Sequence, residues 1–366
     1  MAPTISSEHT AFDTIGTADI IVGGAEHLRL CKATLANAKS HVVIHSCFLS
    51  PGVIASLLPD FAEAARRNVH IDLLWGLRSD PEDASSLSPL IHSEQVLDKL
   101  GPDVRERVRL SPISSGSHGK IILYDDSVSG IWETIVGSCN FLSSYYDLIE
   151  VSLRTRSQRL ATTVLGRLIA TQQPPSGDWS PVARRLDRIW GELRRRSRAK
   201  DEIGEHNLSL LTDDDHYACI TLARDKAQHS IAVGCDLYGL AAETSVLVPM
   251  ERAVQLGRQV QLFYRRPSRY LTQEGRSPDA RGLPLSQVSK LHGKFVIWDE
   301  AALAISSFNW MSTVVLGTRA RGAELGVLAL GPGLHAILSK KLENASGGEV
   351  KIVGGSASHS IEASAG

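Results

Sequence analysis

Short apolar runs alternate with segments of helical spacing along the first half of the chain. Apolar residues recur at helical spacing over 25–39, and the runs 42–49 and 69–76 are strongly apolar. Between these runs the pattern predicts a helix from Pro51 to about Arg67, with Pro59 as a point where it can kink or split. A polar loop at 78–89, a helix near 90–100 and a strand that begins at His118 complete the predicted order.

The second half repeats this order of helix, strand, helix, strand, loop and strand. The corresponding segments are a helix over 218–228, a strand over 230–239, a helix over 241–257, a strand over 259–266 and a strand that begins at His292. An internal repeat of this size indicates a duplicated α/β unit. Strands that alternate with helices predict mixed sheets covered by helices on both faces.

Composition divides the chain into five parts. We predict a polar N-terminal arm at 1–18, a first half at 19–172, a linker with a basic amphipathic helix at 173–212, a second half at 213–353 and a disordered tail at 354–366. The arginine-rich stretch 183–200 has apolar residues at helical spacing, which favours a helix with a solvated basic face. Contact with nucleic acid or with an anionic membrane remains open for this face.

Each half contains one copy of a polar motif. Its first part has the spacing H-x-K-x4-D, and its second part is a small residue, Ser, any residue and Asn. The first copy is His118, Lys120, Asp125, Gly137, Ser138 and Asn140, and the second is His292, Lys294, Asp299, Ser306, Ser307 and Asn309. A histidine and a lysine two apart on a strand face the same side. Imidazole can attack or carry a proton near neutral pH, and an ammonium group suits a phosphate oxygen.

The two copies resemble the motifs of the phospholipase D superfamily, the HKD phosphodiesterases. Its members include phospholipases, phosphatidyltransferases, endonucleases and tyrosyl-DNA phosphodiesterase. The resemblance implies a duplicated α/β/α sandwich of two pseudo-symmetric mixed sheets, with the active site at their interface. Ser306 departs from the motif glycine, and because it is small we expect only a modest effect on the backbone. Both motifs in one chain mean that a monomer can supply a complete site.

The same resemblance implies a mechanism. One histidine attacks phosphorus and the other protonates the leaving oxygen, through a covalent phosphohistidine and without a metal or another cofactor. By resemblance to two-motif members, His118 is the nucleophile and His292 the acid. Lys120, Lys294 and the Ser and Asn residues would hold the non-bridging oxygens. Glu150 and Glu324, each 32 residues after a motif histidine, would orient the catalytic imidazoles.

Other polar residues have weaker assignments. Asp125 and Asp299 lie near strand ends, where bracing a turn or pairing with a neighbouring basic residue is more plausible than chemistry. The loop after strand 259–266 carries arginines and tyrosines where open α/β folds bind ligands, and the loop after strand 69–76 holds the equivalent place. The predicted substrate-binding residues are Arg265, Arg266, Arg269, Tyr270, Trp75 and Arg78. His45, Cys47 and Cys235 lie in apolar strands and are interpreted as packed residues.

Charge and cysteine content limit the class of protein. The formal net charge is −1, so binding to nucleic acid must depend on local patches. Five scattered cysteines without a C-x-x-C pair argue against a zinc site and a disulfide framework, and fit a reducing compartment. A secretory signal pattern and an apolar run of about 18 residues are both absent, which predicts a cytoplasmic location without stable membrane insertion.

These features favour an intracellular nuclease that hydrolyses DNA or RNA, and a role in bacterial defence would fit. The alternative is a phospholipase D or phosphatidyltransferase, for which the low aromatic content of 5% offers no obvious bilayer-entering loop. A non-catalytic scaffold is a third hypothesis, and the intact motifs in both halves argue against it.

Overall fold

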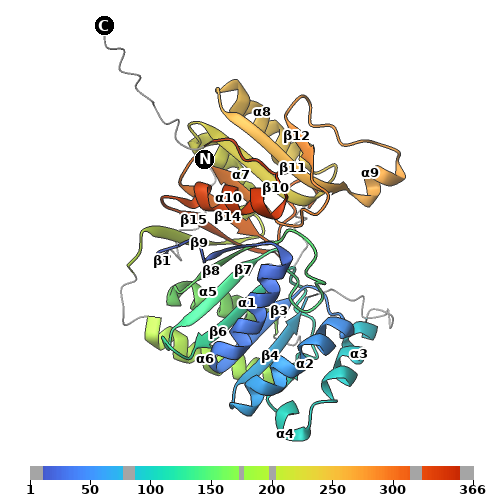
Figure 1. Ribbon diagram of the computed structural model, residues 1–366, viewed down its shortest axis with the longest axis vertical. Coiled ribbons are helices and arrows are strands. Elements are labelled where there is room, and N and C mark those ends of the chain that lie inside the picture. Colours follow the sequence, from blue (N-terminus) through green and yellow to red (C-terminus); the bar gives the residue numbers. More distant parts are fainter. Residues whose placement is uncertain (1–10, 77–86, 173–176, 198–202, 314–323, 355–366) are drawn as a thin grey trace.

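Two β-sheets with surrounding helices form the computed structural model, which describes residues 11–76, 87–172, 177–197, 203–313 and 324–354 (Figure 1). The first sheet has seven strands in the order β2-β8-β7-β6-β3-β4-β5. Their bounds are Ile20–Val22 (β2), Val151–Thr155 (β8), Trp132–Gly137 (β7), Ile121–Asp126 (β6), Ala38–Ser46 (β3), His70–Trp75 (β4) and Val108–Leu110 (β5).

The second sheet has eight strands in the order β1-β9-β15-β14-β13-β10-β11-β12. Their bounds are Ala11–Asp13 (β1), His206–Thr212 (β9), Leu325–Leu330 (β15), Ala302–Ser306 (β14), Phe295–Trp298 (β13), Ser230–Tyr238 (β10), Gln259–Pro267 (β11) and Leu285–Gln287 (β12). In both sheets one end is parallel, namely β3-β4-β5 and β10-β11-β12, and the other pairs are antiparallel. The predicted duplication into two mixed sheets is therefore confirmed.

Strand register relates the two halves residue by residue. In the first sheet His45 on β3 is paired with Ile121, and in the second Gly234 on β10 is paired with Phe295. Ile121 and Phe295 each lie three residues after a motif histidine. His45 and Gly234 therefore occupy equivalent places, and so do the residues that follow them on β3 and β10.

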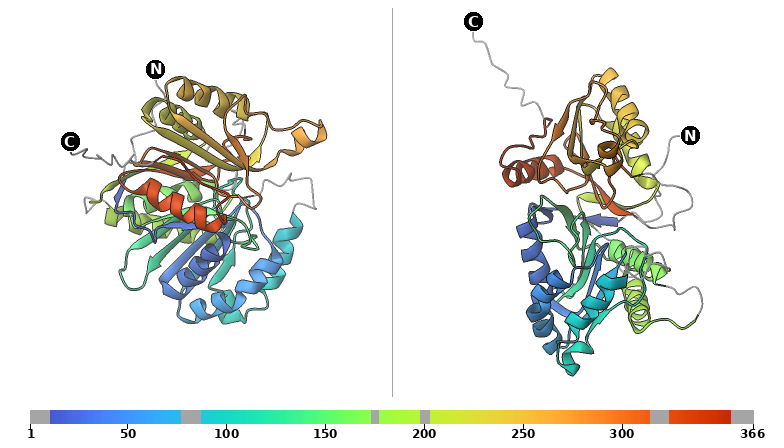
Figure 2. Two further views of the ribbon diagram at one scale, coloured as in Figure 1. Left: turned by 45° about the horizontal axis from the view of Figure 1, so that its top comes forward. Right: turned by 90° about the vertical axis from the view of Figure 1, so that its right-hand side faces the viewer.

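Helices cover the sheets. The first half contains α1 (Gly24–Asn37), α2 (Pro51–Arg66), α3 (Ser88–Leu97), α4 (Pro102–Arg105), α5 (Gln158–Thr171) and α6 (Pro181–Ser197). The second contains α7 (Asp215–Lys226), the π-helix η3 (Glu243–Leu247), α8 (Val248–Gln255), α9 (Arg269–Gln273) and α10 (Leu334–Ala345). Helix α1 lies on one side of the first sheet, and α5 and α6 lie on the other (Figure 2).

Prolines lie within two of the helices. Pro59 lies inside α2 without ending it, and Pro51 stands in the first turn, as predicted. The helix predicted over 241–257 is instead divided into η3 and α8, and Pro249 lies one residue after the junction. Proline has no amide hydrogen to donate to the preceding turn, which accounts for the irregular turn before it.

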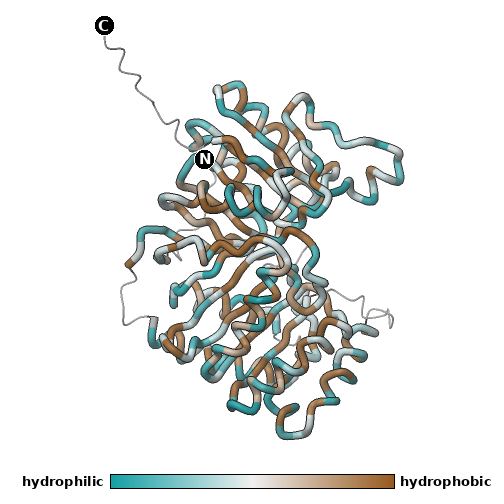
Figure 3. Tube along the Cα trace, in the orientation of Figure 1, coloured by the Kyte–Doolittle hydropathy of each residue, from teal (hydrophilic) through white to brown (hydrophobic). Residues whose placement is uncertain are grey.

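A shared hydrophobic core joins the halves. Its fully buried members include Ile121 and Val151 from the first sheet and Phe295 and Leu325 from the second. The apolar strands run through the centre of the molecule, and hydrophilic segments lie towards the outside (Figure 3). Each half has a further core of its own under its outer helices.

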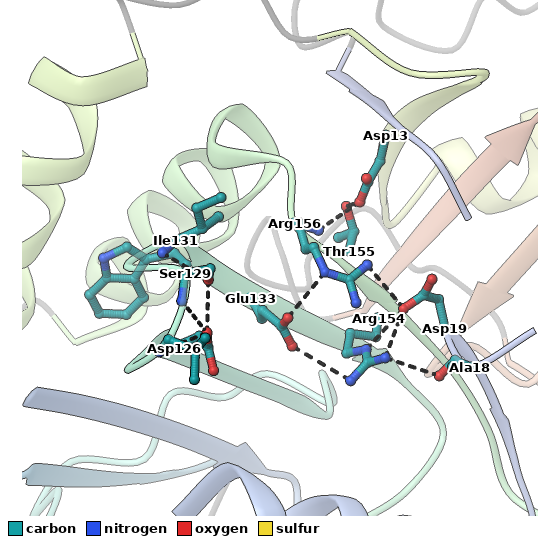
Figure 4. Close-up of polar contacts among 12 residues, drawn as sticks. Asp13, Ala18, Asp19, Asp126, Ser129, Ile131, Glu133, Arg154, Thr155 and Arg156 are labelled. Carbon is teal, nitrogen blue, oxygen red and sulfur yellow. Dashed lines mark hydrogen bonds and ion pairs between the residues drawn. The ribbon is translucent and has the colours of Figure 1, made fainter. Parts of the chain in front are cut away.

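The N-terminal segment ties the two sheets together. Residues 11–13, inside the predicted polar arm, form β1 and pair with β9 of the second sheet. Asp13 accepts hydrogen bonds from Thr155 Oγ1 at 2.7 Å and Arg156 N at 2.6 Å, at the end of β8 in the first sheet. Arg156 also lies 3.2 Å from both Asp19 and Glu133, within the charged network of Figure 4.

Helix α6 belongs to the packed body of the first half. Its apolar residues Leu186, Ile189 and Leu193 are buried in the shared core, and the predicted solvated face carries exposed arginines such as Arg184. The basic amphipathic helix is therefore present and packed. In the part of the chain that the structure describes, no helix has the length and apolar character needed to cross a membrane.

Candidate active site at the junction of the halves

Each motif histidine is hydrogen-bonded to a glutamate of the opposite half. Nδ1 of His118 lies 3.0 Å from Oε2 of Glu324, and Nδ1 of His292 lies 2.8 Å from both carboxylate oxygens of Glu150. An ionised carboxylate can only accept, so Nδ1 of each ring carries the proton and Nε2 is left for chemistry. The predicted acids are present, but each orients the histidine of the other half instead of its own.

The motif serines hold these glutamates. Ser138 donates to Oε2 of Glu150, and Ser307 donates to Oε2 of Glu324 at 2.6 Å. Both serines are fully buried. Their hydroxyls were predicted to meet phosphate oxygens, but the structure places them behind the histidines, where they fix the glutamates.

Backbone contacts also cross the junction. The amides of His292 and Gly293 donate to the carbonyl oxygen of Ile149 at 2.9 and 2.7 Å. A Cβ on Gly293 would lie 2.6 Å from Val151 Cγ2, and one on Gly119 would lie 3.0 Å from Leu325 Cδ1. The glycine between His and Lys therefore lets each motif approach the strand that follows the opposite glutamate.

The motif residues lie just before their strands. His118 and Lys120 precede β6, and His292 and Lys294 precede β13, whereas the sequence predicted that the strands begin at the histidines. Both lysines are fully buried, and each ammonium group donates to the carbonyl oxygen of its own motif histidine, at 2.6 and 2.7 Å.

The charge of Lys120 acts on Lys294. Burial lowers the pKa of Lys294 to about 8, against the raising effects of Asp236 and Glu150, and the charge of Lys120 lowers it further. The His118–Glu324 and His292–Glu150 hydrogen bonds bring the two motifs, and with them the two ammonium groups, to one junction. Two cations held close together in a buried place favour an anionic ligand.

The acids stay ionised. Burial acts to raise the pKa of Glu150, but the charges of His292 and Lys294 outweigh it and hold that pKa at about 2. In the same way, His118 and Lys120 outweigh burial and hold the pKa of Glu324 at about 2.

The two imidazoles differ in basicity. Burial and Lys120 lower the pKa of His118, but Glu324 and a hydrogen bond with Cys47 outweigh them, so this pKa is raised. The pKa of His292 is lowered because burial outweighs Glu150. In the free molecule His118 therefore keeps its proton to a higher pH than His292 does.

The two asparagines are in different states. Oδ1 of Asn140 accepts from the Cys47 amide at 3.2 Å, which leaves the amide nitrogen as the group that can donate to a ligand. Oδ1 of Asn309 is buried and has no hydrogen-bond partner within the described residues.

Two site residues escaped the sequence reasoning. Oδ2 of Asp236 lies 3.8 Å from Nε2 of His292, and Cys47 shares a hydrogen bond with His118. Cys47 was interpreted as a packed residue, and burial raises its pKa, but His118 and Lys120 outweigh burial and lower it. Asp236 stood in an apolar strand without a motif, and only alignment of the two halves would have drawn attention to it.

Asp125 and Asp299 brace strand ends, as predicted. Oδ1 of Asp125 accepts from the amides of Ser40 and His41 at 2.9 and 2.7 Å, near the start of β3. Asp299 accepts from the amides of 228–230 at 2.7, 2.8 and 3.0 Å, at the start of β10. The D of each motif therefore fixes the start of an interior strand, away from the histidines.

The departure at Ser306 has a compensating change. In the first half Gly137 is paired with Ser152, and a Cβ on Gly137 would lie 2.1 Å from Ser152 Oγ. In the second half the pair is reversed, with Ser306 opposite Gly326. In both halves a glycine faces a serine at this crossing, so the close approach of the two backbones is preserved.

Comparison with solved structures supports the architecture. The chain resembles phosphatidylserine synthase from Haemophilus influenzae Rd KW20 with a TM-score of 0.59 and 12% identity, over 94% of this chain and 89% of that one. The chain has the phospholipase D fold. No protein-family profile matches the sequence, and no curated protein matches it either.

Two other solved structures match only part of this chain or only part of their own chain. Nuc, a phospholipase D family member from Salmonella typhimurium, matches 41% of this chain and 99% of its own, at 17% identity and a TM-score of 0.31. Polyphosphate kinase from Porphyromonas gingivalis matches 89% of this chain and 46% of its own, at 13% identity and a TM-score of 0.49.

The predicted substrate-binding residues are distributed unevenly on this phospholipase D fold. Nε of Arg265 donates a hydrogen bond to Asp236. The other residues, Arg266, Arg269 and Tyr270, are exposed along β11 and α9. Trp75 is buried and its Nε1 donates to the Ser111 carbonyl oxygen at 2.9 Å, so it is a structural residue and not a substrate contact. Arg78 lies outside the described residues.

Proposed function

We propose that the chain is a phosphodiesterase that works through a phosphohistidine, and that its substrate is DNA or RNA. The observation that carries the proposal is the reciprocal pair of Glu–His hydrogen bonds, which engage Nδ1 of both imidazoles and orient the two rings at one junction. Two imidazoles can divide a displacement at phosphorus into two easier steps. Lys120 and Lys294 supply the positive charge that stabilises the phosphoryl oxygens.

His118 is the proposed nucleophile and His292 the proposed acid. A carboxylate facing Nε2 disfavours attack on an anionic phosphate, and Asp236 faces Nε2 of His292, whereas His118 has the thiol of Cys47. Given the pKa directions, the form with neutral His118 and protonated His292 is a minor one in the free molecule. In that form the imidazolium of His292, whose pKa is lowered, is the stronger proton donor.

The exposed arginines favour nucleic acid. Arg266 near the end of β11 and Arg276 beyond α9 keep more than half of their side chains exposed, at 59% and 58%. Arg269 and Tyr270 lie between them, and an exposed tyrosine beside arginines can stack on a base while the arginines meet phosphates. The second candidate substrate is phospholipid, which is favoured by the similarity to the phosphatidylserine synthase over most of both chains.

The experiment is hydrolysis in EDTA of labelled single- and double-stranded DNA, RNA and phosphatidylcholine vesicles. We expect nucleic acid to be cleaved, and after an alkaline quench we expect the peptide that contains His118 to carry the phosphate together with the part of the substrate still esterified to it. Turnover of lipid alone would replace the nuclease proposal with the second candidate. Phosphate on His292 would reverse the two roles, and no turnover of any of these substrates would contradict the proposal as a whole.

A bell-shaped dependence of kcat/KM on pH is expected, because one imidazole must be neutral and the other protonated. The acidic limb reports mainly His292, whose pKa is lowered, and the alkaline limb mainly His118, whose pKa is raised. Glu324→Gln removes a carboxylate that raises the pKa of His118, so the alkaline limb moves to lower pH. Glu150→Gln moves the acidic limb to lower pH.

The control for these pH profiles is Asp225→Asn, which changes an exposed carboxylate on α7. Its profile should coincide with that of the unmodified chain. An alkaline limb that stays in place in Glu324→Gln would show that His118 does not set it.

A further inference from the structure

Asp236 places a buried carboxylate beside one of the two reactive imidazoles. Its side chain is 6% exposed, and Oδ1 accepts from Nε of Arg265 at 2.6 Å. This bond fixes the carboxylate so that Oδ2 lies 3.8 Å from Nε2 of His292. Within the described residues, Oδ2 makes no hydrogen bond of its own.

The fold does not require this carboxylate. Asp236 lies two residues after Gly234, and the equivalent residue two after His45 is Cys47. The first half thus builds the same strand, motif and histidine with a cysteine in that place instead of a carboxylate. The charge is specific to the His292 side of the junction, where it opposes the lysines that would bind a phosphate.

The carboxylate is charged as well as buried. Burial acts to raise the pKa of Asp236, but Lys294, His292 and Arg265 outweigh it and lower that pKa. Asp236 therefore remains a full acceptor at neutral pH.

The spacing of Oδ2 and Nε2 suits a bridge through one oxygen atom. At 3.8 Å the two atoms are too far apart for a hydrogen bond with each other. An oxygen that lies to one side of the pair, about 2.8 Å from each atom, a normal hydrogen-bond length, would bridge them. That oxygen would need a hydrogen for Asp236, since a carboxylate only accepts.

The proposed two-step reaction identifies this oxygen. In the first step Nε2 of His118 bonds to phosphorus, the ester P–O bond breaks, and His292 gives its proton to the leaving oxygen. In the second step water attacks phosphorus from the vacated side, His292 takes one of its protons, and the N–P bond breaks with its electron pair returning to His118. Attack and departure in line place both the leaving oxygen and the water next to His292.

Water has two hydrogens, and His292 takes only one. We propose that Asp236 accepts the other and so positions the attacking water, which commits the phosphohistidine to hydrolysis instead of transfer to an alcohol. An alcohol has a single hydroxyl hydrogen, which His292 removes, and its carbon substituent would face the carboxylate. Asp236 is thus a positioning residue for the second step. This inference rests on the proposed phosphohistidine function and on His292 as acid and base.

The test uses bis(4-nitrophenyl) phosphate in buffer that contains methanol. Hydrolysis of the intermediate gives 4-nitrophenyl phosphate, and methanolysis gives methyl 4-nitrophenyl phosphate, so the ratio of the two products measures the partition. We expect Asp236→Asn to raise the ratio of methyl 4-nitrophenyl phosphate to 4-nitrophenyl phosphate about 10-fold. It should also slow steady-state hydrolysis about 10- to 100-fold, the effect of losing a hydrogen bond to a charged group. The initial burst of 4-nitrophenolate should keep its rate.

Two variants make the test robust. In Asp236→Asn, Arg265 retains the amide oxygen, so the amide NH2 group faces the gap and cannot accept. Asp236→Cys installs the side chain that the first half already accommodates at the equivalent place, and it should shift the ratio in the same direction. Asp225→Asn is the matched control, because it removes the carboxylate of a surface Asp–Arg pair on α7 and should leave the ratio unchanged.

The outcomes separate the two levels of the proposal. If the unmodified chain releases no 4-nitrophenolate from the diester, the proposed function fails and the role of Asp236 fails with it. If the diester is cleaved through a burst but the ratio is equal in all variants, only the role of Asp236 is overturned. A fall in the burst rate in both Asp236 variants would place the residue in the first step and would also overturn the inference.

Discussion

His118→Ala is expected to lower phosphodiester hydrolysis by a factor on the order of 10⁴, equivalent to about 5 kcal/mol of transition-state stabilisation. The variant lacks the only proposed nucleophile, so no phosphohistidine forms and no burst of leaving group appears. The loss should be equally large for nucleic acid and for bis(4-nitrophenyl) phosphate, because attack precedes every later step.

His292→Ala should fail at a different point. 4-Nitrophenolate leaves without protonation, so with the nitrophenyl diester the first step proceeds and releases about one equivalent per active site. Water then lacks its base, and the phosphohistidine accumulates on His118, where it is measured by mass spectrometry after an alkaline quench. Nucleic acid should not be cleaved by this variant, because its leaving alcohol needs the proton that His292 supplies.

His92→Ala is the control for both variants, because His92 is an exposed histidine on α3. Circular dichroism establishes whether each variant is folded. Full activity in folded His118→Ala would remove the basis of the mechanism. Burst release in His118→Ala together with none in His292→Ala would exchange the two roles.

Much of this architecture follows from the sequence because the information is local. Helical and strand periodicity, repeated in the same order, predicts two α/β units, and the H-x-K spacing marks the equivalent place in each. Asp125 and Asp299 were also assigned correctly as braces, since a carboxylate near a strand end has free backbone amides within reach.

Contacts between the halves could not be read in the same way. Glu150 and Glu324 follow the histidines of their own halves by the same number of residues, which suggests pairs within each half. In the structure each segment that carries a histidine packs against the strand behind the other glutamate, through Gly119 and Gly293. Sequence separation says nothing about a contact that forms only when two sheets pack face to face.

The partners of buried charges could not be predicted from the sequence either. Asp236 and Asp72 both stand in apolar strands, where a single acid gives no periodic signal. Their partners, Arg265 and Arg185, are supplied by other elements, and no spacing rule connects them. A charged residue within an apolar run is nevertheless informative, because burying it without a partner is costly.

The pair formed by Asp72 and Arg185 is expected to have a large effect on stability. Asp72 on β4 is 1% exposed and Arg185 on α6 is 8% exposed, with Oδ1 and Nη1 3.4 Å apart. Burial raises the pKa of Asp72 to about 7 against the effect of Arg185. Arg185→Met should lower the free energy of unfolding by about 3 kcal/mol at pH 8, because it leaves a buried carboxylate without its partner.

The loss should be smaller at pH 6. A carboxyl whose pKa is raised in the folded state binds a proton there that the unfolded chain does not bind, so its contribution to stability falls as pH rises through about 7. Without Arg185 the pKa of Asp72 rises further. Asp72 is then neutral at pH 6, whereas at pH 8 a fraction of it is ionised without a partner, which lowers the free energy of unfolding. Urea unfolding at the two pH values measures the difference. Arg185 also lowers the pKa values of His41 and His70, so the same measurement on Asp72→Leu combined with Arg185→Met gives the share that these two histidines contribute.

Two further variants determine whether the effect belongs to the pair. Arg184→Met removes the neighbouring exposed arginine from the same helix and should change the free energy of unfolding by less than about 0.5 kcal/mol. Asp72→Leu combined with Arg185→Met replaces both charges with apolar side chains and should recover most of the loss, since two paired charges can often be exchanged for apolar packing. A double variant as unstable as Arg185→Met alone, with the same loss at both pH values, would mean that α6 depends on the packing of the Arg185 side chain and not on its charge.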